Sequence, residues 1–174
     1  MAQPGYILPE PYNEPVYEYR KGSPEKELLT NELKRMKNEN IDIPLIIGGK
    51  EVRTGTTVDV EMPHDLGQKL GTCHLAGEKE LNQAIEAALE AKKAWEKADP
   101  AHRFSIFLKM AELISTKYRY LLNASTMLNQ SKTRHQAEMD ACFEIADFIR
   151  YNVSFAEEIY NMQPESAPNT WNRL

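Results

Sequence analysis

The chain has 174 residues, enough to bury the core of one domain. Its composition, 41% hydrophobic and 27% charged, is ordinary for a globular protein, and no apolar run reaches the ~18 residues of a membrane-spanning helix. The formal net charge of -5 argues against a nucleic-acid-binding protein, and two cysteines without a CxxC pair indicate a reducing compartment rather than a disulfide scaffold.

The first 22 residues are rich in proline. Because proline fixes φ and has no N–H to donate, we predict that residues 1–22 form an extended arm that wraps over other structure. Tyrosines in the arm can anchor it to a partner surface, although an irregular arm on its own domain is the favoured interpretation; they are Tyr6, Tyr12, Tyr17 and Tyr19. Residues 1–19 hold glutamates but neither lysine nor arginine, so they do not form the pattern of a mitochondrial presequence.

A helix and a β layer are expected next. Ser23 followed by Pro24 is typical of a helix start, with a hydroxyl cap and proline at the first helical position. We predict this helix to about Asn38, with inward-facing Leu28, Leu29, Leu33 and Met36. The hydrophobic period then changes, and alternating runs with glycine turns predict a small antiparallel β layer. Its expected strands are residues 43–47, 50–53, 57–62 and 69–75, with turns at Gly48-Gly49 and Gly67.

Three- and four-residue spacing predicts a block of about four helices after the β layer. The first runs from Glu78 to about Ala98, with inward-facing Leu81, Ile85, Ala88, Leu89 and Trp95. The second begins at Asp99-Pro100, the third holds residues 120–128, and the fourth continues to about Asn161. Residues 163–169 are a predicted loop, and residues 170–174 begin a strand that the chain does not complete, as in a truncated product.

The stretch from Leu128 to Asn152 organises the rest of the chain. Ser131 or Thr133 can cap its helix, and its apolar residues follow helical spacing: Ala141, Cys142, Ile145, Phe148, Ile149 and Val153. Glu138 lies in line with this apolar stripe rather than on the polar face. A carboxylate in such a position is costly to desolvate unless it is paired or faces a cavity, so Glu138 is the candidate functional residue.

Three segments of this stretch carry a family resemblance: residues 127–133 (MLNQSKT), 136–141 (QAEMDA) and 145–152 (IADFIRYN). They closely resemble the delta-1-pyrroline-5-carboxylate dehydrogenases, which are aldehyde dehydrogenases of proline breakdown. The resemblance covers nearly the whole chain but only the N-terminal part of the family's proteins. It implies a partial α/β aldehyde dehydrogenase fold without the main Rossmann-like sheet and catalytic domain. Its expected parts are an extended arm (1–22), a β and helical part of the cofactor domain (23–162), and a loop with an unfinished strand (163–174).

The resemblance also implies a function for the whole enzyme. Such an enzyme oxidises L-glutamate γ-semialdehyde to L-glutamate with NAD, in the mitochondrial matrix of a eukaryote or the cytoplasm of a bacterium. By the same resemblance, Glu138 matches a glutamate at the mouth of the substrate tunnel; the open alternative is an acidic residue that the helix dipole favours in the first turns. Where the family usually has glycine, this chain has Ser131, which argues against a close backbone approach there. The expected partners are the rest of the dehydrogenase chain or a second subunit.

The chain lacks the residues that aldehyde oxidation needs. Its 8 glycines all lie at or before Gly77, so neither a GxGxxG turn nor a phosphate loop is present. Cys142 is predicted to pack on the apolar stripe, Cys73 has no base nearby in sequence, and a bridge between them is the less favoured alternative. His64 and His74 lack further ligands at metal-binding spacing. We therefore expect no catalytic, cofactor-binding or metal-binding residues and no dehydrogenase activity from this chain alone.

Two interpretations are compatible with these patterns. The chain is the N-terminal segment of such an enzyme, or it is a non-catalytic truncated paralogue or interaction module within a larger assembly. The unfinished C-terminus favours the first interpretation, because an independent module should end at a polar boundary. Helices that would normally cover a sheet leave their apolar faces exposed when the sheet is absent. We therefore expect the isolated chain to be aggregation-prone or molten.

Overall fold

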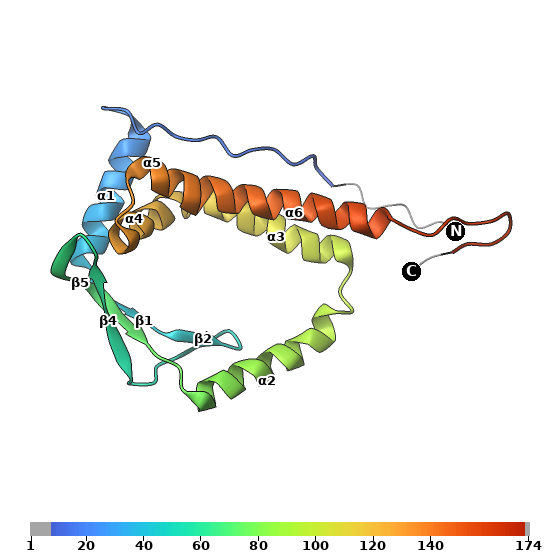
Figure 1. Cartoon of the computed structure of the whole chain (residues 1–174), viewed down its shortest axis with the longest axis horizontal. Helices are drawn as coiled ribbons and strands as arrows, with labels where there is room; N and C mark the ends of the chain where they lie inside the picture. Colours follow the sequence, from blue (N-terminus) through green and yellow to red (C-terminus); the bar gives the residue numbers. More distant parts are fainter. Residues whose placement is uncertain (1–7, 173–174) are drawn as a thin grey trace.

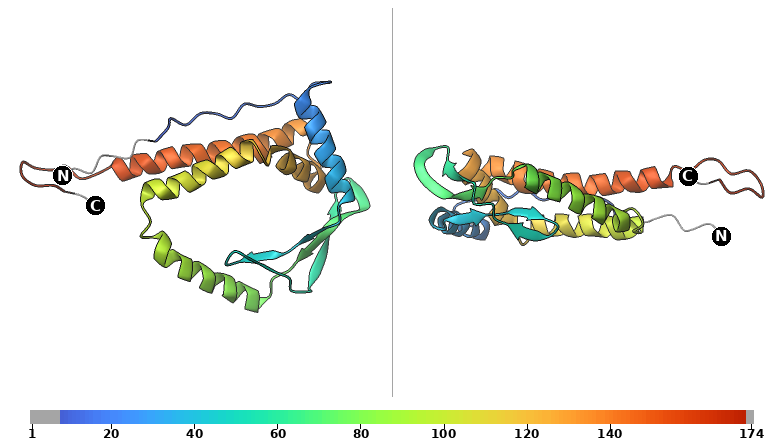
Figure 2. Two further views of the ribbon diagram at one scale, coloured as in Figure 1. Left: turned by 180° about the vertical axis from the view of Figure 1, so that it is seen from behind. Right: turned by 90° about the horizontal axis from the view of Figure 1, so that it is seen from below.

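The computed structural model describes residues 8–172, and its elements follow the predicted order of arm, β layer and helix block. In Figure 1, the long helices α3 (Pro100–Ser115) and α6 (Glu144–Asn161) lie side by side, and the N-terminal arm runs along α6. Helix α1 (Pro24–Asn38) crosses one end of this pair and packs against α4 (Arg119–Gln130). The strands lie below the helix pair in this view. The helices and strands together form an arch-shaped ribbon, which we call the open arch (Figure 2).

Helix α1 begins at Pro24, as predicted, because the fixed φ of proline suits the first helical position. The predicted cap is wrong: the hydroxyl of Ser23 makes no capping hydrogen bond. Leu28 is 50% exposed, because it lies off the face that carries Leu29 and Met36 into the core. That face joins the main core cluster, which consists of Tyr19, Leu29, Met36, Met62, Leu70, Ala124 and Leu128.

The first part of the β layer is a hairpin. Pro44 has no N–H for a ladder, and it divides the first predicted run into β1 (Ile41–Ile43) and β2 (Leu45–Ile47). Strand β2 pairs antiparallel with β3 (Lys50–Val52). The connecting residues Gly48 and Gly49 both have positive φ, 58° and 76°, which is the backbone conformation that the predicted turn requires.

The second part is a three-stranded sheet with the order β1-β5-β4. Strands β4 (Thr57–Met62) and β5 (Asp65–His74) pair antiparallel, whereas β1 pairs parallel with β5, so the layer is mixed rather than entirely antiparallel. The chain reverses at residues 63–64, not at Gly67 as predicted. Gly67 lies inside β5 with φ of 97°, in a segment where the β4–β5 register shifts.

Gly71 permits the close approach of β1 and β5. A Cβ at this position would lie 2.1 Å from the carbonyl oxygen of Ile41, far inside any allowed contact. We expect Gly71→Ala to separate β1 from β5 and to cost about 1–3 kcal/mol, because backbone must move to relieve the overlap. Amide hydrogen exchange at residues 41–43 measures this. Gly77→Ala, where only the flexible carboxylate of Glu80 is near, is the matched control; equal protection in both variants would contradict the prediction.

Helix α2 (Glu78–Trp95) forms as predicted but buries none of its residues. The positions that were predicted to face inward remain largely exposed: Leu81 by 58%, Ile85 by 49%, Leu89 by 59% and Trp95 by 41%. Within the described residues, α2 contacts chiefly the short strand β2. The apolar periodicity of α2 therefore defines a face, and the described part of the chain does not cover it.

The fourth predicted helix is not one regular α-helix. The hydroxyl of Thr133 accepts from the N–H of Gln136 and caps α5 (Arg134–Ala137), which continues into a π-helical turn, η1 (Glu138–Phe143), and then α6. A π turn holds one extra residue and rotates the later part of the helix by about 100°. As a result, Ile145 and Phe148, which were predicted to be inward, are exposed, whereas the charged residues Asp147 and Arg150 are buried.

The segment after α6 has no helix or strand in residues 163–172, and Trp171 is 58% exposed. The strand predicted for residues 170–174 lies partly outside the described residues and stays a prediction. Between residues 8 and 172, no helix combines the length and the apolar character that crossing a membrane requires.

Candidate functional site

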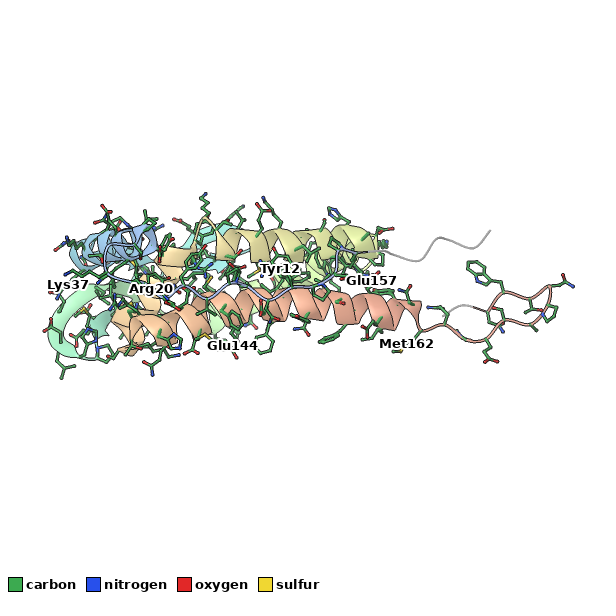
Figure 3. The ribbon with its side chains drawn as sticks, turned by 90° about the horizontal axis from the view of Figure 1, so that it is seen from above. Tyr12, Arg20, Lys37, Glu144, Glu157 and Met162 are labelled. Carbon is green, nitrogen blue, oxygen red and sulfur yellow. The ribbon has the colours of Figure 1, made fainter. Side chains whose placement is uncertain are left out.

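The candidate site is the carboxylate of Glu138, at the first position of the π turn. Its side chain is fully buried, with 0% exposure, between α4 and the N-terminal arm. Figure 3 shows the arm from above, following α6 from Arg20 past Tyr12 toward Glu157. At that far end the N–H of Leu8 donates to Glu157 at 3.1 Å, so the arm is held along most of the helix.

Glu138 receives donors from two sides. From the arm, the N–H of Tyr17 donates to Oε1 at 2.9 Å, and the hydroxyl of Tyr19 donates to Oε2. From α4, the amide of Asn123 donates to Oε2 at 2.7 Å, and the guanidinium of Arg119 contacts both oxygens. Both carboxylate oxygens are therefore saturated by this chain, and a further ligand would have to displace one of these donors.

Arg119, which is 1% exposed, links Glu138 to the arm. Its Nη1 donates to Glu14 at 2.6 Å, and its Nη2 donates to the carbonyl oxygen of Pro15 at 2.5 Å. The guanidinium also stacks on Tyr17, with its Cζ 3.7 Å from the ring centroid. Only a planar group with several fixed donors can make these contacts together, so lysine would not replace Arg119.

A second arginine extends this network onto α6. Nη2 of Arg150 donates to Glu14 at 2.9 Å, and its Nη1 lies 3.5 Å from Asp147. Asp147 in turn accepts from the N–H of Glu14 at 2.7 Å and from the side-chain amide of Asn13 at 2.5 Å. Buried charges are tolerated only when each is paired, and here the arm supplies Glu14 to both arginines. The network therefore fastens the arm to the helix block.

The same contacts keep Glu138 ionised. Burial opposes ionisation, but the hydrogen bonds from Arg119 and Tyr19 outweigh it, so the pKa of Glu138 lies below its ordinary value. Burial, together with the charge of Glu138, raises the pKa of Tyr19, so the hydroxyl remains a donor. The site thus holds a permanently charged carboxylate at neutral pH.

The lowered pKa of Glu138 predicts an acid-sensitive fold. A carboxyl with a lowered folded-state pKa contributes stability above its unfolded value, 4.5, and this contribution is lost as the pH falls through the folded value. We expect the free energy of unfolding to fall below about pH 4.5, and Glu138→Gln to flatten that dependence. Urea unfolding at several pH values measures it, with the exposed Glu18→Gln as control. An equal slope in the Glu138→Gln variant would exclude Glu138 as the cause.

Tyr19 adopts an unusual backbone conformation to reach this site. Its φ is 54°, in the left-handed region, which costs a residue with a side chain about 1–2 kcal/mol. Three contacts offset that cost. The Tyr19 hydroxyl meets Glu138 and accepts from Asn123 at 2.8 Å, and its carbonyl oxygen accepts from Arg134 at 3.3 Å. The contacts of Tyr19 with Glu138 and its neighbours therefore stabilise this turn of the arm.

The thiols of Cys73 and Cys142 contact backbone carbonyl oxygens rather than the side chains of this network. Both are free thiols, so the alternative of a bridge between them is wrong. Cys142 is fully buried, and burial raises its pKa to about 12, which leaves almost no thiolate at neutral pH. The prediction that Cys142 packs in the core is confirmed. Cys73 is partly buried on β5, with its Sγ 3.7 Å from the carbonyl oxygen of His74.

The histidines make structural contacts. Nδ1 of His74 accepts from the N–H groups of Thr54 at 3.1 Å and Gly55 at 3.2 Å, which leaves Nε2 to donate to Asp42 at 3.1 Å. His64 lies 2.9 Å from the hydroxyl of Ser131. Within the described ranges, no three His, Cys, Asp or Glu side chains are grouped as a metal ion would require.

The sequence patterns identified Glu138, but not Arg119, which pairs with it, nor Glu14 and Arg150, which extend the charged network. A signal for one of them exists: Arg119 and Asn123 are four residues apart on α4, so one helical face presents both donors. Glu14 gives no such signal, because only the folded arm brings it to the two arginines.

The described fold and the sequence together define the class of protein. Residues 51–174 match the aldehyde dehydrogenase family, most of the chain. The chain therefore belongs to the aldehyde dehydrogenase family.

Individual relatives indicate which aldehyde dehydrogenases this chain is similar to. The chain is 46% identical over 171 residues to the probable delta-1-pyrroline-5-carboxylate dehydrogenase of Schizosaccharomyces pombe, which covers 97% of this chain and 31% of that protein. It is 43% identical over 168 residues to the mitochondrial delta-1-pyrroline-5-carboxylate dehydrogenase of Dictyostelium discoideum, covering 96% of this chain and 30% of that protein. These findings confirm the resemblance, and they show that the chain spans about 30% of the length of these relatives.

A solved structure agrees with the sequence comparison. The Delta-pyrroline-5-carboxylate dehydrogenase of Mycobacterium tuberculosis bound with NAD has a TM-score of 0.94 and 40% identity, over 99% of this chain and 32% of that chain. The open arch of residues 8–172 is thus a partial aldehyde dehydrogenase fold, as predicted.

Proposed function

We propose that this chain is the N-terminal segment of an NAD-dependent delta-1-pyrroline-5-carboxylate dehydrogenase, which oxidises L-glutamate γ-semialdehyde to L-glutamate in proline degradation. The observation that carries the proposal is that nearly the whole chain aligns, at 46% identity, with less than a third of the Schizosaccharomyces pombe relative. The NAD-bound Mycobacterium tuberculosis structure supports NAD as the cofactor of the whole enzyme. Relatives named as mitochondrial support the mitochondrial matrix as its location.

The exposed apolar faces indicate that a further protein segment covers them. We propose that this segment is the rest of the dehydrogenase chain. Besides the face of α2, helix α6 exposes Phe148 by 59% and Phe155 by 52%. A cavity of about 470 Å³ lies between these helices and α3, lined by Trp95, Phe104, Phe107, Phe148 and Tyr160. Monomeric proteins rarely expose contiguous apolar surface of this kind. A second subunit is the alternative occupant.

Glu138 is the proposed substrate-entrance residue of the whole enzyme. The support is the match of residues 136–140 to the family and the placement of a charged carboxylate on an otherwise apolar stripe. In the described fold its oxygens are saturated, so a substrate group would exchange with a donor already present. The donors that such a group would displace are the N–H of Tyr17 and the hydroxyl of Tyr19, because they come from a segment without helix or strand, whereas the other donors lie on α4.

The second candidate is a non-catalytic truncated paralogue or interaction module. Its support is the apolar surface that α2 and α6 expose, which an interaction module would present to a partner. We propose that residues 1–174 alone form no NADH from the semialdehyde, whichever candidate is correct.

The native size of the product distinguishes the two candidates. An antibody raised against residues 23–162 would capture the product from cell extract, and both its mass and its NADH formation from the semialdehyde would be measured. We expect a product about three times as long as this chain, since the chain spans 31% of a relative, and we expect it to be active. A product of only 20.0 kDa without activity would overturn the enzyme proposal and support the module.

A further inference from the structure

The N-terminal arm has two parts that the fold holds differently. Tyr19 is 3% exposed and belongs to the main core cluster. Nearer the N-terminus, residues 8–16 have neither helix nor strand, and Glu14 is the only buried residue among them. We call residues 8–16 the strap. Because no apolar side chain of the strap is fully buried, the hydrophobic effect holds it only weakly, and its position depends on polar contacts.

The packing beneath the strap agrees with this difference. A cavity of about 300 Å³ lies between the strap and the helices α3 and α6, and its apolar lining includes Pro9, Pro11, Tyr12, Leu108 and Val153. Protein cores are close-packed, so a cavity of this size indicates a contact outside the core. The strap therefore lies on the helix block as a bound peptide would.

The polar contacts of the strap centre on one carboxylate. Arg119 on α4 donates to one oxygen of Glu14 at 2.6 Å, and Arg150 on α6 donates to the other at 2.9 Å. The N–H of Glu14 donates in turn to Asp147 at 2.7 Å. Each oxygen of Glu14 thus accepts a charge-assisted hydrogen bond, which is stronger than a neutral one. The two helices therefore form a site that fits a carboxylate on an extended backbone.

This docking surface keeps its charges paired when the strap is absent. Arg119 also pairs with Glu138, and Nη1 of Arg150 lies 3.5 Å from Asp147. Neither arginine therefore loses its last counterion when Glu14 leaves. A guanidinium buried without any counterion would oppose release strongly, and that situation does not arise here. The helix block can thus hold the docking surface in place while the strap is away.

The composition of the strap suits it to this surface. Pro9, Pro11 and Pro15 fix φ near the value of an extended segment. A segment that is already extended loses less conformational entropy when it docks. The ring of Tyr12 adds a contact with Arg150, whose Cζ lies 4.3 Å from the ring centroid. At the far end of the strap, near Glu157 in Figure 3, the N–H of Leu8 donates to that carboxylate.

We propose that the strap is a detachable segment, which leaves the helix block and returns while Tyr19 remains in the core. The surface around Arg119 and Arg150 binds an extended peptide that carries a carboxylate at the position of Glu14, and residues 8–16 of this chain are its occupant. This role is independent of the reaction that the complete protein catalyses.

Binding of a synthetic strap peptide tests this role. The protein is the complete chain without residues 1–16, and the probe is a fluorescent peptide of residues 8–16 in its wild-type, Glu14→Gln and Glu10→Gln forms. Glu10 is an exposed glutamate of the same segment, so Glu10→Gln matches the change in charge. We expect Glu14→Gln to weaken binding about tenfold or more, and Glu10→Gln to weaken it less than about twofold. Added salt should also weaken binding of the wild-type peptide.

Two results of this experiment would overturn the proposal. One is equal affinity of the Glu14→Gln and Glu10→Gln peptides, which would show that the arginines do not recognise the carboxylate of Glu14. The other is a shortened protein that is folded, as circular dichroism reports, yet binds no strap peptide.

Amide exchange on the intact protein covers the case in which the shortened protein does not fold. The N–H of Glu14 should exchange faster than the helical N–H groups of α4, because the strap opens before the helix block unfolds. Glu14→Gln should speed exchange at Leu8 by about tenfold, and Glu10→Gln should change it less than about twofold. Exchange at Glu14 as slow as in α4, or equal rates at Leu8 in the two variants, would show that the strap is a fixed part of the fold.

Discussion

Replacing Glu138 with alanine is expected to destabilise the protein by about 3 kcal/mol and to release the N-terminal arm. Removing one partner of a buried ion pair costs about 3–5 kcal/mol, because the other charge remains buried without its counterion. The lower end applies here, since Arg119 keeps its contact with Glu14. Tyr17 and Tyr19 lose their acceptor at the same time, so the arm loses two of its anchors.

Two measurements check this prediction. Denaturant unfolding of the complete protein reports the free energy, and amide exchange at Tyr17 reports the release of the arm. Glu18→Ala is the matched control, because Glu18 is an exposed glutamate of the same arm that pairs with the exposed Arg20. Unchanged protection at Tyr17 in Glu138→Ala would show that the other contacts of the arm are sufficient to hold it.

The 174-residue chain on its own is expected to bind a hydrophobic dye strongly and to associate as its concentration rises. The physical reason is the apolar surface that the described residues leave in solvent, including Leu81 and Leu89 on α2 and Phe148 on α6. Dye fluorescence and sedimentation over a range of concentrations measure it, and weak near-UV circular dichroism would add that packing is loose.

Variants of α2 test where the dye binds. Leu81→Lys with Leu89→Lys should reduce dye binding and association without loss of stability, because both side chains are already exposed. Leu29→Lys, which places a charge at a residue that is 1% exposed, should instead unfold the main core. A monomer that melts sharply and binds no dye would contradict the prediction and favour an independent module.

The local elements were predictable because their causes are local. Pro24 and the capped Asp99-Pro100 start helices through backbone geometry, and Asp99 accepts from the N–H of Ala101 at 2.8 Å as a cap should. The glycine pair at residues 48–49 forms its hairpin for the same kind of reason. The parallel pairing of β1 with β5 was not predictable, because it joins segments about thirty residues apart that carry no local signal for it.

The burial of individual helix positions was predicted less well. Periodicity assumes one regular helix, and the π turn after Ala137 changes the phase, so that Asp147 and Arg150 turn inward while Phe148 turns outward. On α2 the periodicity indicated an apolar face correctly but could not indicate whether the described chain covers it.

The order of the elements, the family and the one carboxylate that does not fit an apolar stripe could all be predicted before the fold was known. Each follows from residue type and spacing along the chain. The contacts of that carboxylate follow from the folded arrangement of the arm and α4. Glu14 is 105 residues from Arg119 in sequence, and Tyr19 is 119 residues from Glu138, so only the docking of the arm joins them into one network. The pKa of Glu138 depends on those partners, because burial alone would have shifted it in the opposite direction.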